Sequence, residues 1–263
     1  MSYSPIIVPK TAEITVSRQT GLGIDNYDLD DIYSPDTDLW KSVVLDLGSP
    51  KYPPRVAAAP TRYWFDRSRY RNNGTIIGAI WKQLPSGVWV MQFDGTDDVV
   101  TIASNAVLAP GTSDFSILVW TKVDSTGTGY DYLYTQIGTN QNFALWIANI
   151  TNLFELWTRW DASNTTLKTL GAVNYRDNTW HLFGGVWDRD GNLTGYVDGV
   201  AIDTGDISAF SAINLNAYTT VTIGDAANLL KGIVGKVLYC KRTLSLAEIQ
   251  HIYQAKKWRY QYA

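Results

Sequence analysis

Two tryptophans, one glutamate and one arginine stand close together in the middle of the chain. Trp146 lies in one segment of alternating apolar residues, and Glu155, Trp157 and Arg159 lie in the next such segment. Indole rings have large apolar faces, whereas carboxylate and guanidinium groups form hydrogen bonds with hydroxyls. Aromatic rings beside such polar groups are suited to stack on pyranose rings and fix their hydroxyls. These four residues are our candidate ligand-binding site.

The alternation of the two segments predicts which side chains share a face. Successive residues of a strand point to opposite faces of a sheet. In segment 142–149 and segment 152–160, one set of apolar residues is expected to point into the core: Phe143, Leu145, Ile147, Phe154 and Leu156. Trp146 and Trp157 then point outward on two paired strands. The alternative is that both rings pack under a loop or against a neighbouring subunit, because large aromatic side chains are usually buried.

No arrangement of catalytic residues is evident. Retaining glycoside hydrolysis needs two carboxyl groups roughly 5 Å apart, yet the only glutamates are Glu13, Glu155 and Glu248, in different segments. Neither His181 nor His251 neighbours a nucleophile motif such as Gly-x-Ser-x-Gly. We therefore assign no catalytic residue and expect that the protein is not an enzyme.

The acidic residues near the N-terminus raise the question of a metal site. Six aspartates lie within a short segment: Asp25, Asp28, Asp30, Asp31, Asp36 and Asp38. Carboxylates at this density can bind Ca²⁺, but the glycine and closing glutamate of an EF-hand loop are missing. A solvated stretch, or one that meets a basic partner surface, fits this pattern better. We assign no metal ligand and no cofactor.

Composition excludes several classes of protein. The net charge is −3 with 18% charged residues, so the chain has no basic footprint for nucleic acid. The single cysteine, Cys240, cannot form an internal disulfide. No apolar run is long enough for a membrane-spanning helix. The N-terminus shows no charged region followed by an apolar region, so no signal peptide is expected.

Residues 1–60 differ from the rest of the chain. Seven of the nine prolines lie here, and only residues 12–18 and 41–47 have the character of strands. Proline removes backbone donors and interrupts sheet ladders. We interpret residues 1–60 as an extended arm that docks on another subunit, and residues 61–263 as a β-sandwich. A disordered linker is the alternative for the arm.

From Thr61 onward, short strand patterns follow one another, separated by polar turns. Such spacing is typical of a sandwich or jelly roll. The expected strands are residues 75–81, 86–93, 98–103, 114–123, 130–137, 142–149, 152–160, 165–172, 179–187, 192–198, 219–224 and 233–240. One helix is expected at 246–257, where Ser245 and Glu248 form a capping box. Its apolar stripe consists of Leu246, Ile249, Ile252 and Tyr253.

Five motifs in order carry a family resemblance. They are Asp66-Arg-Ser-Arg-Tyr-Arg-Asn-Asn-Gly-Thr75, Phe93-Asp-Gly-Thr-Asp-Asp98 followed by Phe115-Ser-Ile-Leu-Val-Trp120, Trp180-His181, Gly195-Tyr-Val-Asp-Gly199, and Gly232 to Tyr239 followed by Arg242 to Ile249. This series resembles the laminin-G-like, concanavalin A-like lectin and glucanase β-sandwich family. The resemblance implies an all-β jelly-roll sandwich of two antiparallel sheets with one C-terminal helix.

Two positions depart from the family pattern. Arg69 replaces the first glycine of the opening loop, and Gly235-Lys236 stands where the family usually has acidic residues. In the family, that acidic position often helps the opening loop to hold a structural calcium. A lysine repels a cation, so we expect no calcium at this position.

The pattern as a whole favours a non-catalytic recognition or structural module. The arm, the single cysteine and the laminin-G-like head suggest a virion component, such as a phage tail, fibre or capsid-decoration protein. Its expected partners are glycans and, through the arm, neighbouring proteins in an oligomeric assembly, at the virion or extracellular surface. The alternative is a carbohydrate-active enzyme or its accessory carbohydrate-binding domain.

Overall fold

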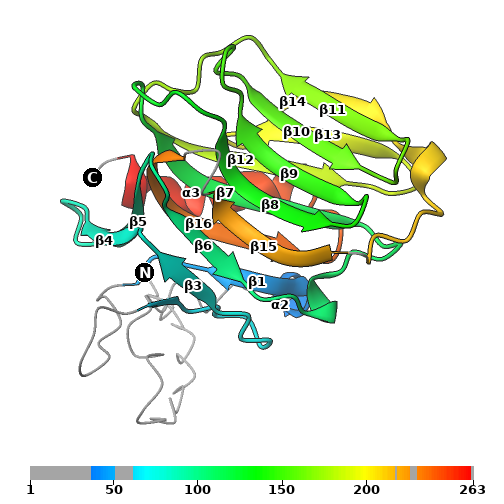
Figure 1. The fold of residues 1–263 in the computed structure, drawn as a ribbon, viewed down its shortest axis with the longest axis horizontal. Coiled ribbons are helices and arrows are strands. Elements are labelled where there is room, and N and C mark those ends of the chain that lie inside the picture. Colours follow the sequence, from blue (N-terminus) through cyan, green and yellow to red (C-terminus); the bar gives the residue numbers. More distant parts are fainter. Residues whose placement is uncertain (1–36, 51–61, 217, 226–229, 262–263) are drawn as a thin grey trace, which may run out of the picture.

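The computed structural model describes residues 37–50, 62–216, 218–225 and 230–261, and this part of the chain forms a sandwich of two antiparallel sheets (Figure 1). The predicted all-β jelly-roll class is confirmed. We call the two layers the back sheet and the front sheet. Short 3₁₀ turns occur at Ala106–Leu108 and Ser208–Phe210.

The back sheet contains eight strands. Its order is β14 (Val200–Asp206), β13 (Asn192–Val197), β12 (Trp180–Trp187), β7 (Phe115–Val123), β16 (Lys231–Cys240), β5 (Trp89–Asp94) and β4 (Ile80–Gln83), with β1 (Val43–Leu47) also paired to β16. A two-residue turn at Asp198-Gly199 joins β13 to β14. Both turn residues have positive φ, of 54° and 81°, as the favoured hairpin turn requires.

The front sheet also contains eight strands. Its order is β11 (Thr165–Leu170), β10 (Phe154–Arg159), β9 (Asn142–Ile147), β8 (Asp131–Gly138), β15 (Tyr218–Gly224), β6 (Val99–Ile102), β3 (Gly74–Ile77) and β2 (Tyr63–Trp64). Strands β8 to β11 follow one another in a meander, so residues that alternate in sequence there form neighbouring rows on each face.

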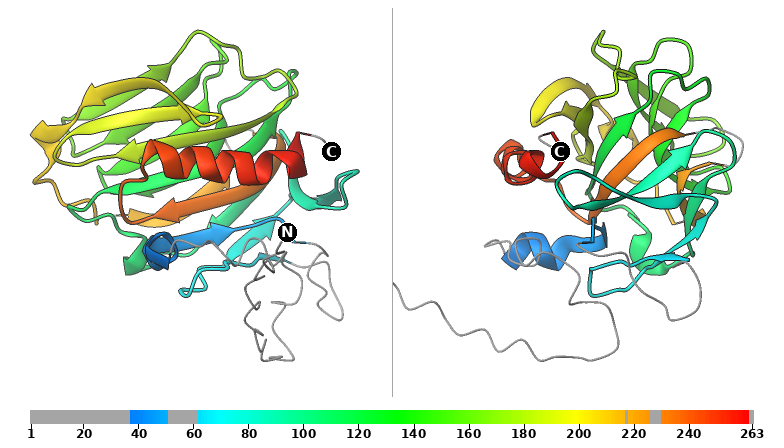
Figure 2. Two further views of the ribbon diagram at one scale, coloured as in Figure 1. Left: turned by 180° about the vertical axis from the view of Figure 1, so that it is seen from behind. Right: turned by 90° about the vertical axis from the view of Figure 1, so that its left-hand side faces the viewer.

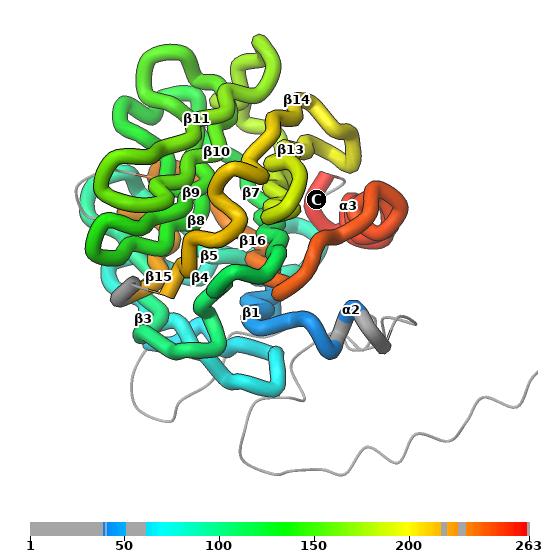
Figure 3. The backbone as a smooth tube through the Cα atoms, turned by 90° about the vertical axis from the view of Figure 1, so that its right-hand side faces the viewer, coloured from blue at the N-terminus to red at the C-terminus, as the bar shows by residue number. Residues whose placement is uncertain are grey.

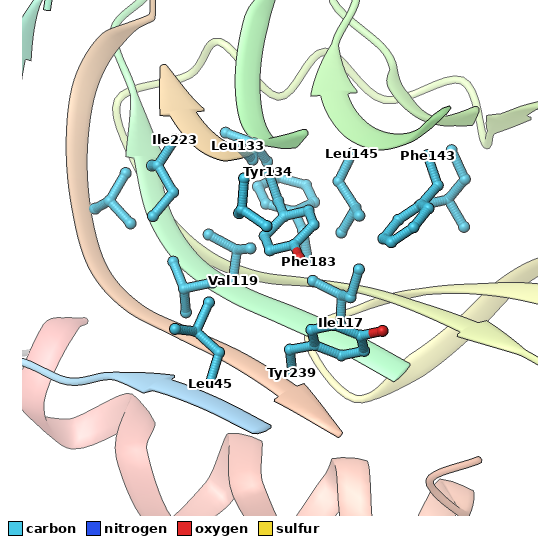
Figure 4. Close-up of a cluster of buried hydrophobic side chains, with 14 of the residues drawn as sticks. Leu45, Ile117, Val119, Leu133, Tyr134, Phe143, Leu145, Phe183, Ile223 and Tyr239 are labelled. Carbon is cyan, nitrogen blue, oxygen red and sulfur yellow. The ribbon is translucent and has the colours of Figure 1, made fainter. Parts of the chain in front are cut away.

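The core fills the space between the sheets. Figure 4 shows side chains from both layers converging, among them Val119 from β7, Leu145 from β9 and Phe183 from β12. Aromatic pairs fix the packing: the Phe115 and Trp187 rings stack with their centroids 4.5 Å apart. Offset aromatic pairs add to the stabilisation that burial gives. A core of this size stabilises the fold without a disulfide.

Helix α3 (Leu246–Tyr260) covers the outer face of the back sheet, and Figure 2 shows it lying across the strands. The predicted capping box is present: the Ser245 hydroxyl accepts from the Glu248 backbone, and the Glu248 carboxylate accepts from the Ser245 backbone. Trp120 stacks on Tyr253 at 5.5 Å. The predicted apolar stripe needs one correction, because Leu246 is 46% exposed and does not join the buried face.

The predicted boundary of the N-terminal arm is wrong in part. Residues Val43–Leu47 lie within the predicted arm, yet they form strand β1 of the back sheet and pair with β16. All five residues of β1 are buried. The apolar side chains of Val43, Val44, Leu45 and Leu47 fit this buried position better than an exposed arm. Short helix α2 (Thr37–Ser42) precedes β1. The remainder of the arm, residues 1–36 and 51–60, lies outside the described residues.

Two strand predictions also differ from the structure. The single expected strand 75–81 is divided into β3 and β4, because Gly78 has a φ of 76° and turns the chain from one sheet to the other. Strand β14 was missed, since its sequence Val-Ala-Ile-Asp-Thr-Gly-Asp is rich in residues that are rare in strands. It forms the edge of the back sheet, where the hairpin turn from β13 determines its pairing.

Candidate functional site

The four predicted ligand-binding residues lie on the outer face of the front sheet. Strands β9 and β10 pair as predicted, with Trp146 opposite Glu155, Ala144 opposite Trp157, and Asn142 opposite Arg159. The apolar residues that alternate with them point into the core. The described helices α2 and α3 lie on the other side of the molecule, as Figure 3 shows. The front face is therefore not covered by a described helix.

Trp146 is held in place by its neighbours. Its indole Nε1 donates a hydrogen bond of 2.7 Å to Oε2 of Glu155, and the Thr169 hydroxyl donates one of 3.2 Å to Oε1. The rings of Tyr132 and Trp157 lie 5.4 and 5.7 Å from the Trp146 ring. Trp146 is only 8% exposed as a result. Trp146 is therefore a buried residue that packs against Trp157, and its hydrogen bond to Glu155 fixes the orientation of its ring.

Trp157 is the more accessible of the two tryptophans. It lies in a row that crosses seven strands of the front sheet and consists of Thr75, Thr101, Thr222, Thr135, Ala144, Trp157 and Leu167. The threonine and alanine side chains on one side of Trp157 are small. Leu167 on the other side is 53% exposed. The nearest of these small residues, Ala144 and Thr135, are themselves buried, and the half-buried Trp157 ring packs against Ala144.

Arg159 is directed toward the loop after β10. Its Nε donates to the Asp161 carbonyl at 3.1 Å, and one terminal nitrogen donates to the Ala162 carbonyl at 3.4 Å. Asp161 accepts hydrogen bonds from the side chain of Asn164 and from the backbone of Ser163 and Asn164, which lowers the pKa of its carboxyl group. A cation and a carboxylate therefore lie together at the end of strand β10.

Sequence reasoning missed Tyr130, Tyr132 and Thr169. The tyrosines join the aromatic cluster from the start of β8, and Tyr130 contacts Trp146 edge-on at 5.9 Å. Their alternation in the predicted strand 130–137 was a usable signal. This signal identifies the two tyrosines only if β8 is known to pair with β9, because that pairing places Tyr132 opposite Trp146.

The structure reveals a histidine cluster that the sequence did not indicate. His181 Nδ1 lies 2.7 Å from Oδ2 of Asp198, and its Nε2 lies 2.7 Å from the Thr179 hydroxyl and 3.1 Å from Asp177. Burial lowers the pKa of His181, but hydrogen bonds and attraction from Asp198 and Asp177 outweigh it, so that pKa is raised. The Thr179 hydroxyl also donates to Asp177, at 2.7 Å. The His181 ring is therefore held between two carboxylates, and the Thr179 hydroxyl beside it is already hydrogen-bonded to one of them.

The glutamates give no carboxylate pair. Of the two that the structure describes, Glu155 binds the Trp146 indole and Glu248 caps α3. Two aspartate groups have carboxylate oxygens within 4.8 Å of one another: Asp94, Asp97 and Asp98, and Asp114, Asp188 and Asp190. Both stand at hairpin turns. Asp98 accepts from the Asp94 backbone at 2.7 Å, as its predicted turn role requires.

A lysine occupies the neighbourhood of the opening loop. Lys236 Nζ lies 2.9 Å from Oδ1 of the buried Asp46, and Arg67 lies 3.8 Å from Oδ2. The Asp66 carboxylate accepts four hydrogen bonds, from the Asp46, Ser68 and Asn72 backbone amides and the Ser68 hydroxyl. Protein donors thus satisfy the Asp66 carboxylate, while two cations lie beside Asp46. That no calcium binds here stays a prediction.

Comparison with known families agrees with the motifs and the fold. The model of the concanavalin A-like lectin/glucanase superfamily matches residues 94–250, which is more than half of the chain. The chain belongs to this superfamily. The comparison with curated proteins found no match. Membership establishes the fold of the sandwich, while the ligand of a superfamily member depends on its own surface.

Solved structures with the same fold include bacterial toxin binding domains. The binding domain of botulinum neurotoxin DC, in complex with rat synaptotagmin II, matches with a TM-score of 0.62 and 15% identity over 82% of this chain and 52% of that chain. The binding domain of Paraclostridial Mosquitocidal Protein 1 matches with a TM-score of 0.64 and 14% identity over 82% and 52%. The receptor-binding domain of botulinum neurotoxin D matches with a TM-score of 0.65 and 14% identity over 83% and 54%. The chain therefore spans about half the length of these structures, and the likeness shows the fold.

Proposed function

We propose that this protein is a non-catalytic recognition module that binds glycan through the outer face of the front sheet. The observation that carries the proposal is the half-buried Trp157 ring on that face, backed by Trp146, which Glu155 holds in place. A ring that is already fixed loses little conformational entropy when a sugar stacks on it. Arg159 supplies a polar contact at one end of the surface.

A recognition role fits the residues better than an enzymatic one. The glutamates of the described part each have a structural partner, and His181 is held between two carboxylates. The toxin domains of the same fold are named as binding domains. The alternative role, a carbohydrate-binding domain attached to a carbohydrate-active enzyme, uses the same front face and differs only in what the chain is joined to.

We further propose that the protein acts as part of an oligomeric virion or extracellular surface structure. Residues 1–36 precede the first described element and would contact neighbouring subunits, while the front sheet faces outward. Among the described residues, no helix has the length and apolar character to cross a membrane. A shallow stacking surface binds single sugars weakly, so display of many copies would raise the effective affinity.

A multivalent form of the protein on a glycan array tests the glycan proposal. We expect Trp157→Ala to reduce binding about 5- to 30-fold, because stacking on one aromatic ring contributes on the order of 1–2 kcal/mol. Trp258 on α3 is 50% exposed and lies on the opposite side of the molecule. Trp258→Ala is therefore a matched control and should leave binding unchanged. Strong binding that is indifferent to Trp157 would place the site elsewhere.

A further inference from the structure

A cavity of about 550 Å³ lies on the outer side of the back sheet, away from the proposed glycan surface. Its floor is formed by Lys122 on β7, which pairs with Trp180 on one side and Ile233 on the other. The turn between β4 and β5 forms one wall and the end of α3 another. A smaller cavity of about 250 Å³ shares several of its lining residues.

Hydrogen bonds hold the walls of this cavity together. The Ser86 hydroxyl in the β4–β5 turn donates to the Arg259 carbonyl of α3 at 3.1 Å. The side-chain amide of Gln261, at the end of α3, donates to the Trp180 carbonyl at 3.2 Å. Figures 1 and 2 both place the C-terminal end of α3 beside the β4–β5 hairpin. The cavity is thus built by three elements that are tied to one another.

The lining of the larger cavity is cationic. It contains Lys82, Lys122 and His181 and no carboxylate. The ring nitrogens of His181 already contact the carboxylates of Asp177 and Asp198. Neither Lys82 nor Lys122 forms a salt bridge or a side-chain hydrogen bond within the described part of the chain. Lys122 also attracts the carboxylate of Asp124, which lines the adjoining smaller cavity with Asp94. Within the larger cavity no carboxylate faces the two ammonium groups, and this arrangement favours an anionic ligand.

Two glutamine side chains with neutral acceptor atoms line the same cavity. Gln83 and Gln261 each use the amide nitrogen in hydrogen bonds, to the Gly87 carbonyl and to the Trp180 carbonyl. Their side-chain carbonyl oxygens accept no hydrogen bond from described residues and are available for hydroxyl donors. A simple inorganic anion has no such donors, whereas an acidic sugar has several. The volume is within the range of small-molecule sites.

We propose that this cavity binds an acidic saccharide of one or two rings that carries a carboxylate or sulfate group. Lys82 and Lys122 contact the charged group, and the carbonyl oxygens of Gln83 and Gln261 accept hydrogen bonds from the ring hydroxyls. The site is separate from the front sheet and does not depend on the glycan surface around Trp157. Both lysines are needed because a single charge-assisted contact near water is weak.

Calorimetric titration of the whole protein at low ionic strength tests the proposal, with glucuronic acid, galactose 6-sulfate, galactose and inorganic sulfate as probes. We expect at least one acidic sugar to bind about tenfold or more tightly than galactose. The double variant K82Q/K122Q should lose this preference. The control K41Q/K168Q removes the same charge from residues that do not line the cavity and should retain it. Both variants are checked for an unchanged melting temperature.

Three results would overturn the assignment. One is that neither acidic sugar binds better than galactose. Another is that K82Q/K122Q folds normally and keeps the full preference. The third is that inorganic sulfate binds as tightly as galactose 6-sulfate, which would leave an anion site without recognition of the sugar ring. Trp157→Ala should not change these titrations, so failure of this site is distinguishable from failure of the front-face proposal.

Discussion

At the scale of single residues, Glu155 both stabilises the fold and holds Trp146 in place in the candidate surface. Its carboxylate accepts from both the Trp146 indole and the Thr169 hydroxyl. We expect Glu155→Ala to destabilise the fold by about 1–3 kcal/mol, because it leaves a buried N–H without a partner. Thermal or urea unfolding measures this change. Glu155→Gln keeps an acceptor for the indole and should cost less. A Glu155→Ala variant as stable as the wild type would contradict the supporting role.

His181 makes stability depend on pH in a defined direction. Its pKa in the folded state is raised above the usual value of 6.5, because attraction to Asp198 and Asp177 exceeds the effect of burial. The stabilisation is therefore fully present below pH 6.5 and is lost as pH rises through the raised pKa. Denaturant unfolding from pH 5 to 9 should show this decline in the wild type. His181→Gln should remove that part of the decline. An identical pH profile in both proteins would show that the contacts of His181 with the two aspartates do not stabilise the fold.

At the scale of elements, strand β1 decides where the folded domain begins. Its four apolar residues are buried, and the carbonyl of Gly48, just beyond its end, accepts a hydrogen bond from the Trp64 indole at 2.9 Å. We expect a chain that begins at residue 61 to lose about 5 kcal/mol or more of stability, or not to fold, because it lacks this burial. A chain that begins at Thr37 retains β1 and is the control. Equal melting temperatures for the two chains would show that β1 is dispensable.

Local patterns predicted that the two tryptophans share a face, but not what surrounds them. Alternation in β9 and β10 placed Trp146 and Trp157 on one face, since strand geometry depends on neighbouring residues alone. Burial of Trp146 by Tyr132 depends on the pairing of β8 with β9, which alternation does not reveal. The back-sheet cavity joins residues that are distant in sequence, from Lys82 to Gln261. No local motif marks such a site, so it became evident only from the assembled fold.

The same contrast applies to element boundaries. Ser245 and Glu248 marked the start of α3 correctly, because a capping box is a local interaction. Proline content misled the interpretation of residues 41–47, since β1 is held by its pairing with β16 at the other end of the chain. Composition describes the average character of a segment. It does not detect a single strand that completes a sheet.

At the scale of the whole molecule, the two sheets have different outer faces. The back sheet packs outer apolar residues against α3, and the cationic cavity lies at one end of that helix. The outer face of the front sheet carries the aromatic cluster of Tyr132, Trp146 and Trp157. The described part of the chain therefore has two chemically different outer faces.

These two surfaces should respond differently to salt. Stacking on Trp157 depends on dispersion and the burial of apolar area, which salt at moderate concentration changes little. Contacts of Lys82 and Lys122 with a carboxylate or sulfate are screened, since the Debye length falls from about 30 Å at 0.01 M salt to about 8 Å at 0.15 M. We expect neutral-glycan binding to be nearly constant over this range and to depend on Trp157, while acidic-sugar binding weakens and depends on the lysines. Array binding and calorimetry of Trp157→Ala and K82Q/K122Q at both salt concentrations measure the two effects. Loss of both activities in either variant alone would mean that the protein has one ligand surface instead of two.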